Sequence, residues 1–215
     1  MVTVLLVLVS VAVVTQPLEA ALHPVDRGTV TVILDLGEGR FADLAPSLRQ
    51  EVSAIFRIPG LRISWRVLDE STPSEQFERL VLVRFLEAGP PATEATSTQY
   101  DRLGSVTQSN EAILPFVDIA CDRVHHLVQE AIQDATVARQ KELLGRACGR
   151  VLAHELYHIL AQTSEHANRG IAKAAFTRTD LLEPDLTLTN SSIRRIKRAM
   201  PARNQHGSPP QLSLR

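Results

Sequence analysis

The chain has 215 residues, a formal net charge of −1 at pH 7 and 44% hydrophobic residues. This balance gives no electrostatic reason to expect nucleic acid as a partner. The length and the supply of apolar residues favour one domain with a single hydrophobic core. The sequence contains no internal repeat, phosphate-binding loop or nucleophile elbow, so it does not suggest a repeat protein, a P-loop protein or an α/β-hydrolase.

The N-terminal segment is apolar. Residues 2–14 are almost all apolar, and the small residues Ala20 and Ala21 follow. The run is too short to span a membrane and has about the length of a signal-peptide core, although no Lys or Arg precedes it. We predict that residues 1–20 are a signal peptide; a buried first strand is the alternative. The protein is then expected to be secreted or periplasmic without stable membrane anchoring, because no lipid-attachment cysteine follows.

The next segments predict a strand and then a helix. Residues 29–34 are rich in β-branched residues and predict a strand, and apolar residues at helical spacing predict a helix over 44–56. Asp43 is expected to cap this helix, Pro46 fits its first turn, and Pro59-Gly60 ends it.

Further strands are expected at three places. Apolar residues alternate over 61–67, which predicts a half-buried strand, and the apolar run at 80–83 is typical of a central strand. Residues 113–119 are a third candidate, and Pro115 predicts that this strand is an edge strand or carries a bulge. The stretch 88–110 is rich in Pro, Thr, Ser and Gln and long for a connection, which favours either a functional loop over a cleft or a mobile loop.

A long helix is predicted after Asp134, and it carries the sequence HELYH from His154 to His158. Histidines four residues apart lie on the same helical face, so both imidazoles can reach one metal ion. Glu155 lies beside that face, where it can accept a proton from a water molecule that the metal activates. The flanking residues are mostly apolar, so burial of these polar groups without a partner would be costly. A half-exposed helix with its polar residues in water is the alternative.

A catalytic zinc ion usually has three protein ligands and an open position for water. His166 is the predicted third ligand, Glu165 is the second choice, and an ordinary loop histidine is the alternative interpretation. In an unbroken helix the eight residues from His158 to His166 would separate these side chains by about 12 Å. The chain must therefore turn between them, and residues 162–170 supply the polar and glycine residues that such a reversal uses.

An HExxH helix followed by a turn and a third histidine resembles the metzincin zinc peptidases, most of all the archaemetzincin-like branch. In their pattern, HExxHxxGxxH, Ala161 stands at the glycine and Ser164 at the third histidine, and His166 comes two residues later. Ala172 occupies the place of the methionine that metzincins carry in a turn beneath the metal. The resemblance implies an α+β, zincin-like domain over residues 21–200. Its parts would be a small twisted mixed sheet, a backing helix, a long active-site helix and a short C-terminal subdomain.

The same resemblance implies a zinc-dependent peptidase that acts on peptide or protein substrates. Its Zn²⁺ ligands would be His154, His158 and His166, and Glu155 would be the general base. A strand within residues 103–119 would line the cleft and pair with an extended substrate.

The competing hypothesis is a non-catalytic exported domain. Its histidines would hold zinc only for structure or would bind no metal. A closed site would need a fourth donor, such as Glu165 or Asp180, and would leave no water to activate.

The remaining candidate ligands are two cysteines and a pair of adjacent histidines. Cys121 and Cys148 lack the CxxC spacing of a structural zinc site, and a disulfide and two buried thiols are equally weighted interpretations. His125 and His126 are expected at the surface of a short helix rather than on a metal, because neighbouring side chains on a helix point apart.

A last helix is predicted from about Asn190 to Met200. Its basic cluster is explained as a solvated helix face, and residues 201–215 are predicted to be a disordered tail. The sequence indicates neither the substrate preference nor the oligomeric state. The basic residues of the cluster are Arg194, Arg195, Lys197 and Arg198.

Overall fold

The computed structural model describes residues 25–202, apart from 38, 40, 69–74, 87–101, 111 and 185. The expected signal segment and nearly all of the expected tail lie outside the described residues and stay predictions. Within the described part, no helix has the length and apolar character needed to cross a membrane.

Strands and helices follow one another much as the sequence predicts, and the α+β class is confirmed. The strand β4 lies within the stretch 88–110 that was expected to be a loop, and also within residues 103–119, where the resemblance implied a cleft-lining strand. The elements are β1 (Gly28–Asp35), the 3-10 turn η1 (Ala42–Leu44), α1 (Ala45–Ile55), β2 (Leu61–Val67), β3 (Leu80–Leu86), β4 (Gly104–Ser109), β5 (Ala112–Ala120), α3 (Cys121–Ile132), α4 (Val137–Ala161), α5 (Arg178–Leu182) and α6 (Asn190–Ala199).

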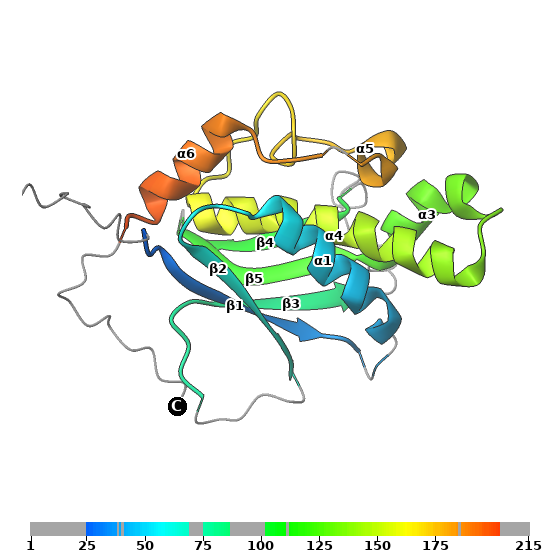
Figure 1. The fold of residues 1–215 in the computed structure, drawn as a ribbon, viewed down its shortest axis with the longest axis horizontal. Coiled ribbons are helices and arrows are strands. Elements are labelled where there is room, and N and C mark those ends of the chain that lie inside the picture. The colour runs from blue at the N-terminus through cyan, green and yellow to red at the C-terminus, as the bar shows by residue number, and fades with distance from the viewer. Residues whose placement is uncertain are drawn as a thin grey trace, which may run out of the picture.

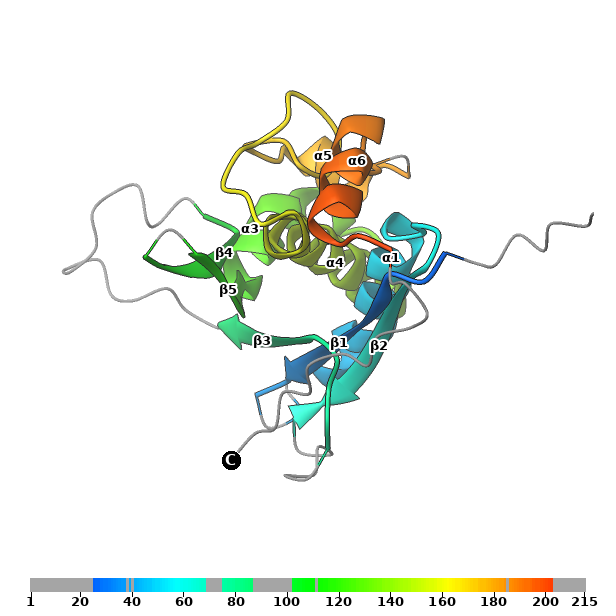
Figure 2. The ribbon, with the colours of Figure 1, turned by 90° about the vertical axis from the view of Figure 1, so that its left-hand side faces the viewer.

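The five strands form one mixed sheet in the order β2-β1-β3-β5-β4. β1 pairs in parallel with β2 and β3, β3 pairs in parallel with β5, and β4 runs antiparallel to β5 at the edge. α1 and α4 pack over one face of this sheet, and their contact with it forms the core (Figure 1). α5 and α6 lie on the other side of α4, so α4 is sandwiched between the sheet and the C-terminal segments (Figure 2).

The strand predicted at 113–119 exists as β5, but its predicted edge position is wrong. β4 pairs beyond it and takes the edge. Pro115 falls where the β4–β5 register shifts, between the pairs Val106–Val117 and Gln108–Ile113, which confirms the alternative of a bulge. The apolar pattern did not predict β4, because its sequence, GSVTQS, lacks the apolar alternation of a half-buried strand.

The predicted cap of the first helix is also wrong. α1 begins after η1, its N-cap residue is Leu44, and no side chain caps it. Asp43 lies in the 3-10 turn, and its carboxylate pairs with Lys141 Nζ on α4 at 2.5 Å. Pro46 does lie in the first turn of α1, as expected.

α4 is the element that positions the site. Thr136 caps it by accepting a hydrogen bond from the Arg139 N–H, and every residue from 147 to 161 is buried. α1 packs closely along it because Gly149 has no side chain: a Cβ there would lie 3.0 Å from the Leu48 carbonyl oxygen. The motif-bearing half of α4 is packed between the sheet, α1 and the C-terminal segments.

A buried arginine joins α4 to two neighbouring helices. Arg150 on α4 is fully buried, and its Nε donates to Glu51 Oε1 on α1 at 2.7 Å. Its Nη1 donates to the Asp180 carbonyl oxygen on α5 at 2.6 Å. Arg150 thereby ties three helices together one turn before the first motif histidine.

The two cysteines meet in the core. Cys121 begins α3, Cys148 lies on α4, and their Sγ atoms are 3.5 Å apart. Both are buried free thiols in this structure, joined by a weak hydrogen bond and not by a disulfide. They pack as small apolar side chains between the two helices.

Candidate metal centre

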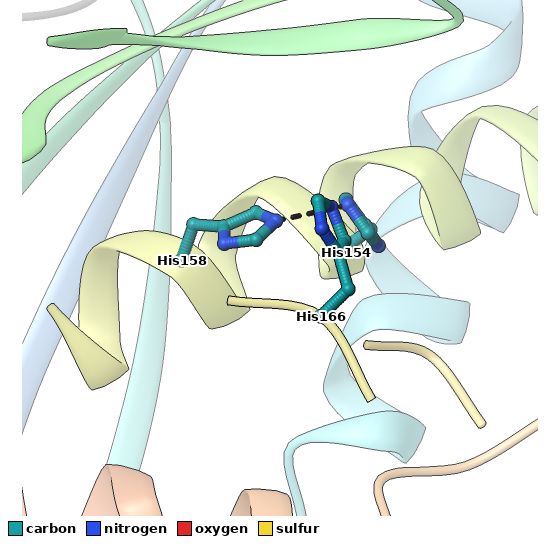
Figure 3. A group of neighbouring side chains, drawn as sticks. All are labelled: His154, His158 and His166. Atoms are coloured by element: carbon teal, nitrogen blue, oxygen red, sulfur yellow. Dashed lines mark hydrogen bonds between the residues drawn. The ribbon is translucent and has the colours of Figure 1, made fainter. Parts of the chain in front are cut away.

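The two motif histidines project from α4 into one cleft. His154 is 8% exposed and His158 is 5% exposed, and their ring centroids are 4.6 Å apart. Their Nε2 atoms approach to 3.0 Å (Figure 3). The helical spacing of four residues produces this convergence on one face of the helix.

The other ring nitrogen of each histidine is bound to a backbone carbonyl. His154 Nδ1 lies 2.8 Å from the Ile171 carbonyl oxygen, and His158 Nδ1 lies 2.6 Å from the Thr163 carbonyl oxygen. Because a carbonyl can only accept, each Nδ1 must carry the proton and donate it. Each Nε2 of the neutral ring is then an unprotonated acceptor, which is the form in which imidazole binds metals.

Two acceptor lone pairs that face each other at 3.0 Å repel unless a cation lies between them or one ring is protonated. Burial works against protonation: it lowers the pKa of His154 from 6.5 to about 4 and lowers the pKa of His158 as well. Ligands of a tetrahedral zinc ion lie about 3.3 Å from one another, given bonds of about 2.0–2.1 Å. The pair is thus arranged for a metal cation, with small adjustment of the rings.

His166 reaches the same point from the loop after α4. The helix ends at Ala161, and Gln162 takes a left-handed conformation with φ of 47°, which turns the chain back. The ring centroid of His166 lies 5.2 Å from that of His154 and 4.9 Å from that of His158. One ring nitrogen from each of the three histidines lies within 4.8 Å of the others (Figure 3).

The alternative donors have other partners. Glu165 forms an ion pair with Arg195 at 2.5 Å. Asp180 pairs with Lys173 and accepts from the Thr177 hydroxyl in the capping box of α5. Among the described residues, no fourth histidine, cysteine or carboxylate joins the group formed by the three histidines.

The segment after His166 forms the floor under the histidines. Ala167 donates to the Ala172 carbonyl oxygen at 2.7 Å, and a bridge joins Ala167 to Lys173, so the chain folds back on itself. This fold brings the Ile171 carbonyl to His154, and Ile171 and Ala172 are both buried. The turn is therefore present with a small residue, Ala172, where the resemblance expected methionine.

Glu155 lies beside the histidines and faces the edge strand. It is 6% exposed and lines a cleft of about 950 Å³ together with the three histidines. Burial raises its pKa from 4.5 to about 8, against the opposing charge of Arg102. A Cβ at Gly104 of β4 would lie 2.8 Å from Glu155 Oε1, so the bare backbone of β4 closes around this carboxyl group.

No protein-family model matches the chain, and no curated protein matches its sequence. Similar folds are found among solved structures. A zinc-dependent peptidase from Methanocorpusculum labreanum is similar at 10% identity and a TM-score of 0.47, covering 78% of this chain and 99% of that one. An archaemetzincin from Methanopyrus kandleri is similar at 8% identity and a TM-score of 0.46, covering 80% of this chain and 94% of that one.

Three features of the cleft were not predicted from the sequence. Arg102 lies in the stretch expected to be a loop and carries no recognisable pattern. Gly104 lies within residues 103–119, where a cleft-lining strand was expected, but its close contact with Glu155 was not expected. Phe176 packs edge-on against His154 with centroids 5.4 Å apart, and a single aromatic residue gives no signal of a site. His125 and His126 are exposed on α3 as expected; His126 lies at the cleft but outside the histidine group.

Burial of Glu155 and His154 makes the free energy of unfolding depend on pH. Glu155 has a folded-state pKa of about 8 against 4.5 unfolded, so its contribution is fully present below pH 4.5 and is lost as pH rises through 8. His154 acts in the opposite direction: its contribution is present above pH 6.5 and is lost as pH falls towards 4.

The contribution of Glu155 can be separated from that of His154 by urea unfolding of the metal-free wild type and of Glu155→Gln. The free energy of unfolding of both proteins is measured from pH 4.5 to 8.5. The stability of the wild type relative to the variant should fall with rising pH by up to about 5 kcal/mol. A difference that stays flat over this range would contradict a buried, protonated Glu155.

Proposed function

We propose that this chain is a zinc-dependent peptidase in which His154, His158 and His166 hold the metal and Glu155 is the general base. One observation carries the proposal. Two buried, neutral imidazoles turn their acceptor nitrogens towards each other at 3.0 Å because backbone carbonyls occupy their donors, and a third histidine joins them. With three protein ligands and no fourth among the described residues, a coordination position stays open for water, which favours catalysis over a structural site.

When bound, zinc supplies a Lewis acid that polarises the scissile carbonyl and acidifies a water molecule. Glu155 accepts the proton of that water and later delivers it to the leaving amine. In the metal-free protein Glu155 holds a proton at neutral pH; beside a dication its pKa falls, and it becomes a base. Thr163 and Ile171 fix the ring orientation of the two motif histidines through their carbonyl oxygens.

The cleft suits an extended peptide. Gly104, Ser105, Val106 and Gln108 of β4 line it, and β4 is the edge strand of the sheet. Its outer backbone groups can pair with a substrate strand, which would run past Glu155 at the level of Gly104. We therefore propose peptide or protein substrates bound in strand form.

Export is part of the same proposal. It depends on the apolar run at residues 2–14 and the small residues after it, all outside the described residues. N-terminal sequencing of the protein recovered from its native compartment tests it, and a mature chain that begins near residue 21 is the expected result.

Zinc reconstitution tests the peptidase. The chelated protein should take up about one zinc ion per chain and should cleave peptides in an unbiased mixture, followed by mass spectrometry. Chelation should stop the cleavage, and added zinc should restore it. If the zinc-loaded protein leaves every peptide intact, the site is structural or serves another reaction.

Gly104→Ala should lower kcat/KM by about 10- to 100-fold while the zinc content stays unchanged. The added Cβ would lie 2.7 Å from Val151 Cγ1 and 2.8 Å from Glu155 Oε1, so the general base must move. Ser109→Ala, in the same strand but outside the cleft lining, is the matched control and should retain its activity. Unchanged activity of Gly104→Ala would show that Glu155 does not depend on this contact.

A further inference from the structure

A second cavity adjoins the metal site. It encloses about 1020 Å³ between the loop at 166–170, the segment at 186–189 and α6. His166 lines both this cavity and the cleft that holds Glu155. The two cavities are therefore adjacent at His166, and one extended ligand can reach both.

The lining of this second cavity is strongly basic. It includes Arg169, Arg194, Arg195 and Arg198 and, among the described residues, no aspartate or glutamate. Arg195 is held in place by Thr163 Oγ1 at 3.0 Å and Glu165 Oε2 at 2.5 Å. The other three arginines are exposed and form no ion pair with any described residue, so their charge is available to a ligand.

The sequence favoured a solvated helix face for the cluster at 194–198. The structure divides this cluster. Arg194, Arg195 and Arg198 line the cavity, while Lys197 does not. The beginning of α6, at Asn190 and Ser191, lies in the same lining and adds the positive end of the helix dipole.

The basic cavity is linked to the metal site through short contacts. The Thr163 hydroxyl accepts from Arg195 at 3.0 Å, and the Thr163 carbonyl accepts from His158 Nδ1 at 2.6 Å. One residue thus connects the arginine cluster to a metal-site histidine. An extended peptide advances about 3.3 Å per residue, so a side chain a few residues from the scissile bond can enter the cavity.

The neighbouring cleft carries charges of both signs. Its lining includes Arg102, Arg123 and Lys173 against Asp122 and Glu155, and Lys173 is paired with Asp180. The excess of positive charge therefore lies in the second cavity, although the whole chain has a formal net charge of −1. A cleft with one dominant sign of charge raises the local concentration of oppositely charged ligands.

We propose that the cavity lined by Arg169, Arg194, Arg195 and Arg198 is a substrate subsite for aspartate or glutamate side chains, which gives the enzyme a preference for acidic peptides. The inference rests on the proposed peptidase function. Arginine pairs with carboxylates through two parallel hydrogen bonds, which makes it suited to this role. Nucleic acid fits less well, because the one aromatic ring besides His166 in the lining, Tyr157, is buried and offers no surface for base stacking.

Peptide binding tests the subsite without cleavage. Two fluorescein-labelled peptides that differ only in Glu against Gln are titrated with the Glu155→Gln protein at low salt, and anisotropy is measured. The Glu peptide should bind at least about fivefold more tightly. This ratio should fall below about twofold in a further Arg194→Gln/Arg198→Gln variant and should shrink as salt is added.

Arg57→Gln is the control for charge alone, since Arg57 is exposed after α1 and outside both linings. It should keep the ratio, and circular dichroism should show the same helix content in all variants. Equal or absent binding of the two peptides would overturn the subsite, as would an equal loss in Arg57→Gln or tighter binding of a thymidine oligonucleotide.

The two proposals fail in different ways. Cleavage of neutral and acidic peptides at equal rates by the zinc-loaded wild type, with no difference in binding, removes the subsite and leaves the peptidase. A clear Glu preference in binding without any hydrolysis removes the peptidase and leaves an anion-selective peptide site.

Discussion

Glu155→Gln should lower peptide cleavage by about 10²- to 10⁴-fold while about one zinc ion stays bound per chain. Glutamine keeps the size of the side chain and its place against Gly104 but cannot accept the proton of water. The three histidines keep their own geometry, because their orientation depends on α4 and on the carbonyls of Thr163 and Ile171. Hydrolysis of a quenched fluorescent peptide and zinc analysis by atomic emission measure the two effects on the same sample.

Glu142→Gln is the matched control for this variant. Glu142 is an exposed carboxylate on α4, paired with Arg139 and Arg146, and lies outside the cleft. Its replacement should leave cleavage unchanged. Loss of zinc from Glu155→Gln would instead make Glu155 a ligand, and retained cleavage would place the general base on another residue.

His158→Ala and His166→Ala should each weaken zinc binding by more than about 100-fold, since loss of an outer partner of a ligand alone costs 10- to 100-fold. The effect should be largest for His158, whose ring is buried and anchored at 2.6 Å to Thr163. His166 comes from an exposed loop, so its loss should leave a weaker two-ligand site. Competition with a zinc-binding dye measures the dissociation constants.

Two further variants decide the identity of the third ligand. Glu165→Gln should bind zinc as the wild type does, because Glu165 pairs with Arg195 rather than with the histidines. His126→Ala, which removes an exposed histidine at the cleft, should also retain the metal. The opposite pattern, with zinc held by His166→Ala and lost by Glu165→Gln, would make Glu165 the third ligand.

The sequence predicted those parts of the site that follow from one helix. Residues four apart share a helical face, so His154 and His158 could be placed together, with Glu155 beside them, before any fold was known. The apolar flanks indicated that this helix is buried, and α4 is indeed surrounded by the sheet, α1 and α6. The strands with clear apolar patterns, at 29–34, 61–67 and 80–83, were predicted for the same local reason.

The parts that depend on chain reversals or on partners distant in sequence could not be read in this way. Residues 162–170 could only be predicted to turn, and the left-handed Gln162 is what brings His166 to the other two histidines. β4 is polar in sequence and became a strand because β5 offered it a pairing edge. Pro115 was compatible with an edge strand or with a bulge. Because β4 pairs with β5 beyond it, the bulge is the alternative that the structure shows.

The sequence by itself determined the pair of motif histidines, the glutamate beside them and the helix that carries all three. Only the tertiary structure supplied the carbonyls of Thr163 and Ile171 that fix the imidazole tautomers, the contact of Gly104 with Glu155, and the arginine-lined cavity beyond His166. The physical reason is the range of the interactions. Helical periodicity is set by neighbours within four residues, whereas the surroundings of a side chain are set by whichever segments pack against its element.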